Sequence, residues 1–153
     1  ADLDRWLAAC PLTVRAEEPI ADDDDLAATR AVREAVYGVL EAVLARRLPA
    51  AEHVEALNAA AAHPPLVPRV DPATGARSWW RPTARAALSE IARDALDLLA
   101  TRDQWDRLRL CASADCDIVF YDNSRPGRRR WCSDARCGDR NRARAYRARK
   151  RGG

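Results

Sequence analysis

Residues 111–137 read CASADCDIVFYDNSRPGRRRWCSDARC and contain four of the five cysteines of the chain. These cysteines form two close pairs with the spacing C-x4-C-x15-C-x4-C, and they are Cys111, Cys116, Cys132 and Cys137. Each pair can occupy one edge of a tetrahedral metal site, and the residues between the pairs let the chain double back. Zinc suits four thiolates, because it is soft enough for sulfur and favours four-coordination. The spacing therefore predicts one structural Zn²⁺ whose four positions are all filled by protein sulfur.

Two other interpretations of the paired cysteines are two disulfides and free buried thiols. The usual spacing within a metal-binding pair is about two residues, so x4 is a looser match. Disulfides, however, persist only in oxidising compartments. No signal peptide precedes the chain as given, so we expect reduced thiols and a cytoplasmic protein.

The charge of the chain is divided unevenly. Residues 1–105 carry 12 arginines against 17 acidic residues, a net charge of −5. Residues 106–153 carry 14 basic against 6 acidic residues, a net charge of +8, which gives the whole chain its formal +3. A basic segment that follows an acidic one suggests a two-part protein whose second part meets a polyanion.

Two further features of the composition bound the class of protein. No apolar run is long enough to span a bilayer, so we expect no membrane partner. Methionine is absent, so we expect the chain to be either processed or a fragment.

The first part of the chain reads as helical. Apolar residues at helical spacing, with an acidic run before the first of them, predict long helices over about residues 26–47, 50–62 and 82–101. A short helix is also predicted at residues 2–10, where Cys10 reads as a small buried hydrophobe. The only histidines, His53 and His63, have no cysteine beside them, so we expect surface or capping roles for both.

Residues 66–82 interrupt this helical pattern. Two short apolar runs flank turn residues at 71–75, which predicts a β-hairpin. Trp79 and Trp80 could line a ligand pocket, but we favour one packing on the helices and the other resting half exposed. Three amphipathic helices and a hairpin can bury a modest core, so residues 1–103 are predicted to form one α-rich domain.

The cysteine-containing part is predicted to form a finger over residues 106–151. Its expected elements are strands at about 108–110 and 118–121, a turn at 122–127 and a helix over about 133–150. We expect Phe120 and Trp131 to cover the metal, because so short a segment cannot bury enough apolar surface without a staple.

The C-terminal helix carries an arginine stripe, since Arg140, Arg144, Arg147 and Arg151 are spaced 4, 3 and 4. A second basic cluster lies at Arg128, Arg129 and Arg130. A helix that is charged on every side has no face for a core. Nucleic acid would supply the missing counter-charge, and arginine can hold both phosphates and guanine edges. A solvated, frayed tail is the alternative; the anchored start, the second cluster and the acidic remainder of the chain argue against it.

These residues resemble a known family. The cysteine spacing, with FYDNS at 120–124, RRWCS at 129–133 and CGDR at 137–140, resembles the bacterial CGNR zinc-finger proteins. The resemblance covers residues 107–151, and residues 1–105 are similar, more weakly, to the helical ABATE-type domain that precedes this finger. It implies a DNA-binding regulator of bacterial stress or metabolism, with the four cysteines as zinc ligands and the arginines as the DNA-facing set. Asp139 stands where the name motif has asparagine; we expect it to offset the helix dipole and nearby arginines rather than face DNA.

The sequence thus predicts a mainly α protein, in which a helical N-terminal domain with a small β-hairpin precedes a small treble-clef-like, four-cysteine zinc finger with a long basic C-terminal helix. The expected partners are duplex DNA and, at the N-terminal domain, a small-molecule effector; the oligomeric state stays open. An RNA-binding or ribosome-associated finger and a protein adaptor are the alternatives. An enzyme is not expected, because no histidine follows His63 and no catalytic triad or Gly-rich phosphate loop is visible.

Overall fold

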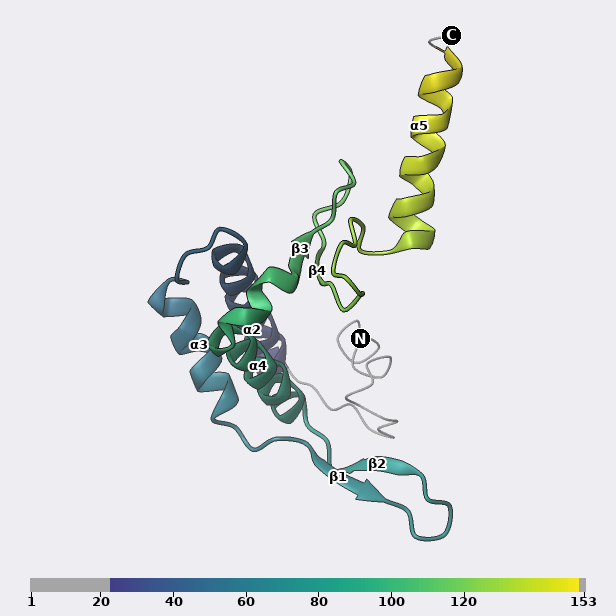
Figure 1. The fold of residues 1–153 in the computed structure, drawn as a ribbon. Helices are drawn as coiled ribbons and strands as arrows, with labels where there is room; N and C mark the ends of the chain where they lie inside the picture. Colours follow the sequence, from purple (N-terminus) through teal and green to yellow (C-terminus); the bar gives the residue numbers. More distant parts are fainter. Residues whose placement is uncertain (1–22, 152–153) are drawn as a thin grey trace.

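The computed structural model describes residues 23–151, so the helix predicted at residues 2–10 lies, with Cys10, outside the described residues. The elements in chain order are α2 (Asp23–Leu44), α3 (Ala51–Ala61), β1 (Val67–Val70), β2 (Arg77–Trp80), α4 (Ala84–Ala100), η1 (Arg102–Arg107), β3 (Leu108–Leu110), β4 (Val119–Tyr121), η2 (Asp134–Gly138) and α5 (Asp139–Arg151). The predicted fold class is confirmed: the chain is mainly helical, with two small antiparallel hairpins and a C-terminal helix. Figure 1 shows α2, α3 and α4 packed together, with the β1–β2 hairpin and α5 extending from opposite ends of the molecule.

The first helix, α2, ends at Leu44 rather than at about Arg47 as predicted. Arg46 adopts a left-handed backbone conformation with φ 57°. Its N–H donates to the carbonyl of Val43 at 3.0 Å, and the N–H of Arg47 donates to the carbonyl of Ala42 at 2.9 Å. This pair of bonds is a Schellman motif, which satisfies the last carbonyls of a helix. Apolar spacing does not reveal where such a closure falls, so the predicted end was too late.

Helices α2, α3 and α4 share one apolar core. Its buried members are Val32, Ala35, Val39, Val43, Leu57, Leu88, Ala92, Ala95, Trp105 and Leu108. Burial of a valine or leucine side chain contributes about 1.5–3 kcal/mol, so these residues hold the three helices together. The Oγ1 of Thr83 accepts a hydrogen bond from the N–H of Ala86 at 3.1 Å and caps the start of α4.

The two histidines belong to this helical part. The ring of His53 packs against Gly38 of α2, where a Cβ would collide with it, so glycine permits the close approach of α3 to α2. His63 is exposed at the end of α3, and its carbonyl accepts a hydrogen bond from the buried Ser89 hydroxyl at 2.8 Å.

Strands β1 and β2 form the predicted hairpin, with Val67 opposite Trp80 and Val70 opposite Arg77. The carboxylate of Asp71 accepts hydrogen bonds from the N–H groups of Ala73 and Thr74 and shapes the turn. Trp79 packs against a small cluster of Leu66, Ala84 and Ala87, whereas Trp80 is 51% exposed. The preferred interpretation of the tryptophan pair is therefore confirmed, and Trp80 in addition lines a cavity of about 310 Å³, as the alternative expected.

The finger begins as a continuation of the helical core. Trp105 of η1 and Leu108 of β3 are buried in the same cluster as the helices, and Trp105 donates through Nε1 to the carbonyl of Leu98 at 3.2 Å. Strand β3 pairs antiparallel with β4, with Leu108 opposite Tyr121. An ion pair between Arg46 and Asp106 also joins the end of α2 to this segment.

The chain ends in a helix with two parts. Residues Asp134–Gly138 form one π-helical turn, η2, and α5 continues from Asp139 to Arg151 without a buried residue. Within the described residues, no helix is long and apolar enough to cross a membrane.

Candidate metal centre and basic surface

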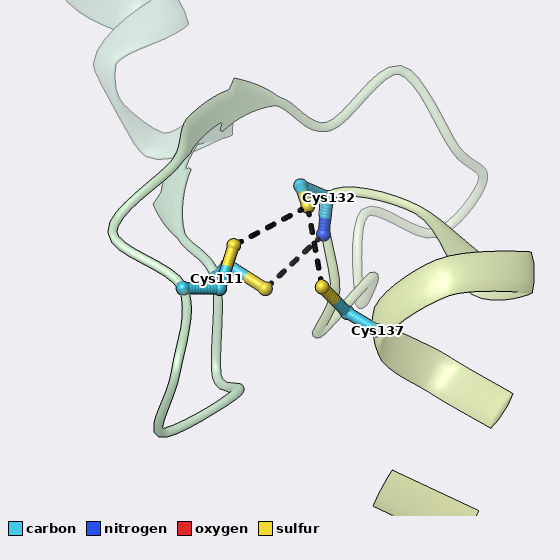
Figure 2. Close-up of side chains that lie close together, drawn as sticks. Cys111, Cys132 and Cys137 are labelled. Atoms are coloured by element: carbon cyan, nitrogen blue, oxygen red, sulfur yellow. Dashed lines mark hydrogen bonds between the residues drawn. The ribbon is translucent and has the colours of Figure 1, made fainter. Parts of the chain in front are cut away.

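Four sulfur atoms meet at the centre of the finger. The Sγ atoms of Cys111, Cys116, Cys132 and Cys137 all lie within 4.8 Å of one another. The Sγ of Cys132 lies 3.7 Å from that of Cys116 and 3.7 Å from that of Cys137. Figure 2 shows Cys132 between Cys111 on the hairpin side and Cys137 on the helix. Residues 111–116 and 132–137 therefore bring together the two pairs that the spacing singled out.

These separations fit a metal rather than disulfides. Four tetrahedral thiolates at about 2.3 Å from a zinc ion lie about 3.8 Å from one another. A disulfide needs about 2.05 Å between sulfurs. All four cysteines are free thiols in the structure. The arrangement is thus that of a four-thiolate cage for a tetrahedral cation.

Protein donors around the sulfurs add to this fit. The N–H of Cys132 donates to the Sγ of Cys111 at 3.5 Å, and the guanidinium of Arg140 lies 3.6 Å from the Sγ of Cys137. Burial alone would raise the pKa of Cys111, but the backbone N–H groups of Cys132 and Ser113 outweigh it and lower the pKa to about 7.

The site stabilises one ionised thiol, but it does not by itself stabilise four. Burial, followed by the neighbouring thiols of Cys116, Cys137 and Cys111, raises the pKa of Cys132 to about 12. Four clustered thiols can all ionise only when a cation compensates their charge. The donor set therefore fits a divalent, thiophilic metal such as zinc.

Asp122 organises the turn that leads to the second cysteine pair. Its buried carboxylate accepts hydrogen bonds from the N–H and hydroxyl of Ser124 and from the N–H of Arg129 at 2.9 Å. The Ser124 hydroxyl, together with the two N–H groups and Arg109, outweighs burial and lowers the pKa of Asp122. Gly127, at φ 82°, completes the turn beside the Arg107 guanidinium, where a Cβ would collide.

The start of the C-terminal helix is fixed to the cysteine pairs. Ser133 caps η2 by accepting from the N–H of Arg136 at 3.2 Å. The side-chain amide of Asn141 donates to the Ser113 hydroxyl at 2.9 Å and to the Cys137 carbonyl at 2.8 Å. These bonds tie the helix to residues 111–116, the loop of the first cysteine pair.

The predicted arginine stripe divides into two halves. Arg140 points back to the Sγ of Cys137, and Arg144 forms an ion pair with Asp115, which raises the pKa of Arg144. Arg147 and Arg151 lie further along α5, are exposed and form no ion pair within residues 23–151. The first half of the stripe therefore braces the finger, and the second half is free to meet a partner.

The second predicted cluster is divided in the same way. Arg129 is partly buried; it donates to the carbonyls of Trp131 and Cys132, and its guanidinium lies 5.1 Å from the centre of the Phe120 ring. Arg128 is exposed, and Arg130 is exposed over the Trp131 ring at 5.1 Å. Phe120 and Trp131, which we expected to cover the metal, are half buried. The guanidinium of Arg129 lies over the Phe120 ring, and that of Arg130 lies over the Trp131 ring.

The sequence predicted that Asp139 offsets neighbouring arginines such as Arg142, and the structure confirms the contact with Arg142. Its guanidinium lies 5.7 Å from the Trp131 ring and forms ion pairs with Asp139 at 2.7 Å and Asp134 at 3.1 Å. Hydrogen bonds from Asp134 and then Asp139 raise its pKa. The spacing of Asp139 and Arg142 on one helix predicts this pair, but the positions of Trp131 and Asp134 beside Arg142 come from tertiary structure.

A cavity of about 410 Å³ lies between α4 and the finger hairpin. Its lining residues are Asp94, Asp97, Leu98, Thr101, Gln104, Leu108 and Tyr121. Cavities of roughly 300–1,000 Å³ commonly hold small molecules, so the junction of the two parts has room for a ligand.

A helical core that continues into a four-cysteine finger defines the class: a helical domain joined to a zinc-finger module. Comparison with family models agrees. Residues 1–102 match ABATE, described as "Putative stress-induced transcription regulator", and residues 107–150 match the CGNR zinc finger, zf-CGNR. The chain belongs to the ABATE family, with a CGNR zinc finger at its C-terminal end. None of the curated proteins compared with the sequence matches it.

Proposed function

We propose that this chain is a transcription regulator that binds duplex DNA through its finger and helix α5. The observation that carries the proposal is the anchoring of α5 at one end only. Its thirteen residues bury no side chain and read DRNRARAYRARKR, so seven basic groups stand against one acid. Such a helix is unstable without counter-charge, and the major groove of DNA admits an α-helix.

Zinc held by Cys111, Cys116, Cys132 and Cys137 is the second part of the proposal. When bound, zinc cross-links the hairpin side of the finger to the start of the helix. The bonds from Asn141 to Ser113 and from Arg144 to Asp115 act between the same two segments. The direction of α5 relative to the hairpin would then depend on the metal.

Of the seven arginines that the sequence suggested, we assign DNA contact to those whose side chains make neither a hydrogen bond nor an ion pair within residues 23–151. These are Arg128, Arg130, Arg147 and Arg151. Arg129, Arg140 and Arg144 would act indirectly, by holding the finger in shape. This assignment narrows the set that the sequence suggested, because three of its seven arginines are engaged inside the finger.

Two finer assignments belong to the same proposal. Reduced thiolates need a reducing compartment, so the bacterial cytoplasm is the proposed location. An effector of the helical part, residues 1–103, would bind in the cavity beside Asp97 and Tyr121, where it touches both that part and the finger, residues 106–151.

Competition between duplex DNA and duplex RNA of the same length tests the function. The zinc-loaded chain is titrated with labelled DNA at one salt concentration, and each unlabelled duplex is added as competitor. We expect DNA to compete better. Equal or better competition by RNA would show that the finger binds RNA. If the chain binds neither duplex, the remaining function is that of a protein adaptor.

A further inference from the structure

The β1–β2 hairpin is a basic arm on an acidic part of the chain. It projects from the helices at the end of the molecule away from α5 (Figure 1). Every residue of β1 is exposed, and Trp80 of β2 is 51% exposed. Residues 67–81 carry three arginines and one acid, Asp71, whose carboxylate is occupied by the turn.

The strand register places the exposed groups on one face. Val67 lies opposite Trp80, and Arg69 lies opposite Ser78, so these four residues share a side of the ribbon. The guanidinium of Arg69 lies 4.9 Å from the centre of the Trp80 ring. Arg81, which adopts a left-handed backbone with φ 44°, lies over the same ring at 5.6 Å. We call Val67, Arg69, Trp80 and Arg81 the arm face.

The opposite face of the ribbon has a different role. It carries Pro68, Val70, Arg77 and Trp79, since these residues alternate with those of the arm face. Trp79 packs on the helical part through Leu66 and Ala84, and Arg77 lies 4.6 Å from the Trp79 ring. This face therefore holds the arm to the body. The base of the arm face borders a cavity of about 310 Å³, which Val67, Trp80 and Arg81 line together with residues of the helical part. The rest of the arm face is exposed.

The chemistry of the arm face suits nucleic acid. A guanidinium stacked on an indole is held in place, yet its N–H edge stays free to bind phosphate or a base edge. Arg69, Arg77 and Arg81 form no ion pair with a carboxylate within residues 23–151, although hydrogen bonds of the turn and, as a smaller cause, the charge of Arg69 lower the pKa of Asp71. The face also combines charge with an exposed aromatic ring, and the major groove admits a two-stranded ribbon as well as a helix.

We propose that the arm face is a second contact for duplex DNA, separate from the finger. This inference rests on the proposed DNA-binding function, and it adds a contact at the other end of the molecule. A second copy of the chain is the competing occupant, since Val67 and Trp80 could also bury apolar surface in a dimer.

Two single substitutions on opposite faces test the proposal in the full zinc-loaded chain. Arg69→Gln and Arg77→Gln each remove one arginine stacked on one tryptophan, so they differ only in the face that they alter. Binding to a long mixed-sequence DNA duplex is measured over a series of salt concentrations, with thermal melting as the check on folding. We expect Arg69→Gln to reduce the salt slope by about 0.9, the value for one lost phosphate contact, and Arg77→Gln to leave it unchanged. Arg69→Gln with Arg81→Gln should reduce it by about 1.8.

The contrary results are distinct. Unchanged slopes for both Arg69→Gln and Arg77→Gln, with wild-type binding intact, would overturn the arm while sparing the finger. An equal reduction of the salt slope in Arg69→Gln and Arg77→Gln would also overturn the proposal, because the contact would then not be confined to the arm face. Unchanged DNA binding with a loss of self-association on sedimentation, in Arg69→Gln or in Trp80→Ala, would assign the face to a second copy. Absence of DNA binding by the wild type would end the proposed function and the arm proposal together.

Discussion

The turn of the finger is built around the carboxylate of Asp122. This residue is fully buried, and both of its carboxylate oxygens accept hydrogen bonds, one from Ser124 and the other from the N–H of Arg129. Asparagine would keep one acceptor but set an N–H₂ group against a donor. We expect Asp122→Asn to lower the melting temperature of the finger, and Asp117→Asn, an exposed control, to leave it unchanged.

The same carboxylate predicts a pH dependence. The pKa of Asp122 is lowered in the folded chain, while an unfolded aspartate titrates at about 3.9. The stabilisation is therefore fully present above about pH 4 and is lost as the pH falls through the lower folded pKa. The difference in unfolding free energy between wild type and Asp122→Asn should be constant from pH 7 to pH 5 and shrink in stronger acid. A difference that grows as the pH falls would contradict this role.

Asp139 is the residue at which the chain departs from the family motif. Its ion pair with Arg142 fits a structural role, but the C-terminal helix begins one turn earlier, at Asp134, where Ser133 caps it. The predicted offset of the helix dipole by Asp139 is therefore wrong, since that effect is confined to the first turn. Asp139→Asn should lower the melting temperature of the finger slightly, because it weakens the exposed ion pair with Arg142. DNA preference should not change. Tighter or altered DNA binding with unchanged melting would show that the residue faces DNA.

Helix α5 divides into a half that braces the finger and a half that is free. Arg147→Gln with Arg151→Gln should reduce the salt slope of DNA binding by about 1.8 and leave melting unchanged, because both side chains project into solvent. Arg144→Gln should instead lower the melting temperature of the finger, because it releases Asp115. Equal effects of both variants on melting and on binding would contradict the division.

The elements themselves were largely predictable from the sequence. Apolar periodicity gave three long helices, and turn residues gave the hairpins, because these patterns are local. The end of α2 was not predictable, since the left-handed Arg46 closes the helix without a glycine. The roles of Arg129 and Arg144 were not predictable either, because their partners, the Cys132 carbonyl and Asp115, are brought near only by folding of the finger. A charge pattern identifies a basic helix but not which of its arginines are already engaged.

The finger and the helices pack against each other. Trp105 and Leu108 are buried in the helical core, and Tyr37 of α2 donates to the Asp117 carbonyl at 3.4 Å. Structural zinc contributes about 10–16 kcal/mol in finger peptides, so chelation should unfold residues 111–151. We expect the helical signal to persist but to melt at a lower temperature than in the zinc-loaded chain. Identical melting of the helices before and after chelation would show that the two parts are independent.

The central claim is that a metal-organised finger presents arginines to DNA. Its most direct test is the salt dependence of binding to duplex DNA by the zinc-loaded chain and by the same chain after chelation. We expect log K to fall with log salt at a slope of about −3.6 for the four arginines of the finger and α5, or about −5.4 when Arg69 and Arg81 also bind. We expect chelation to remove most of the affinity. A DNA affinity that does not change with salt concentration, or that is equally high after chelation, would contradict the proposal.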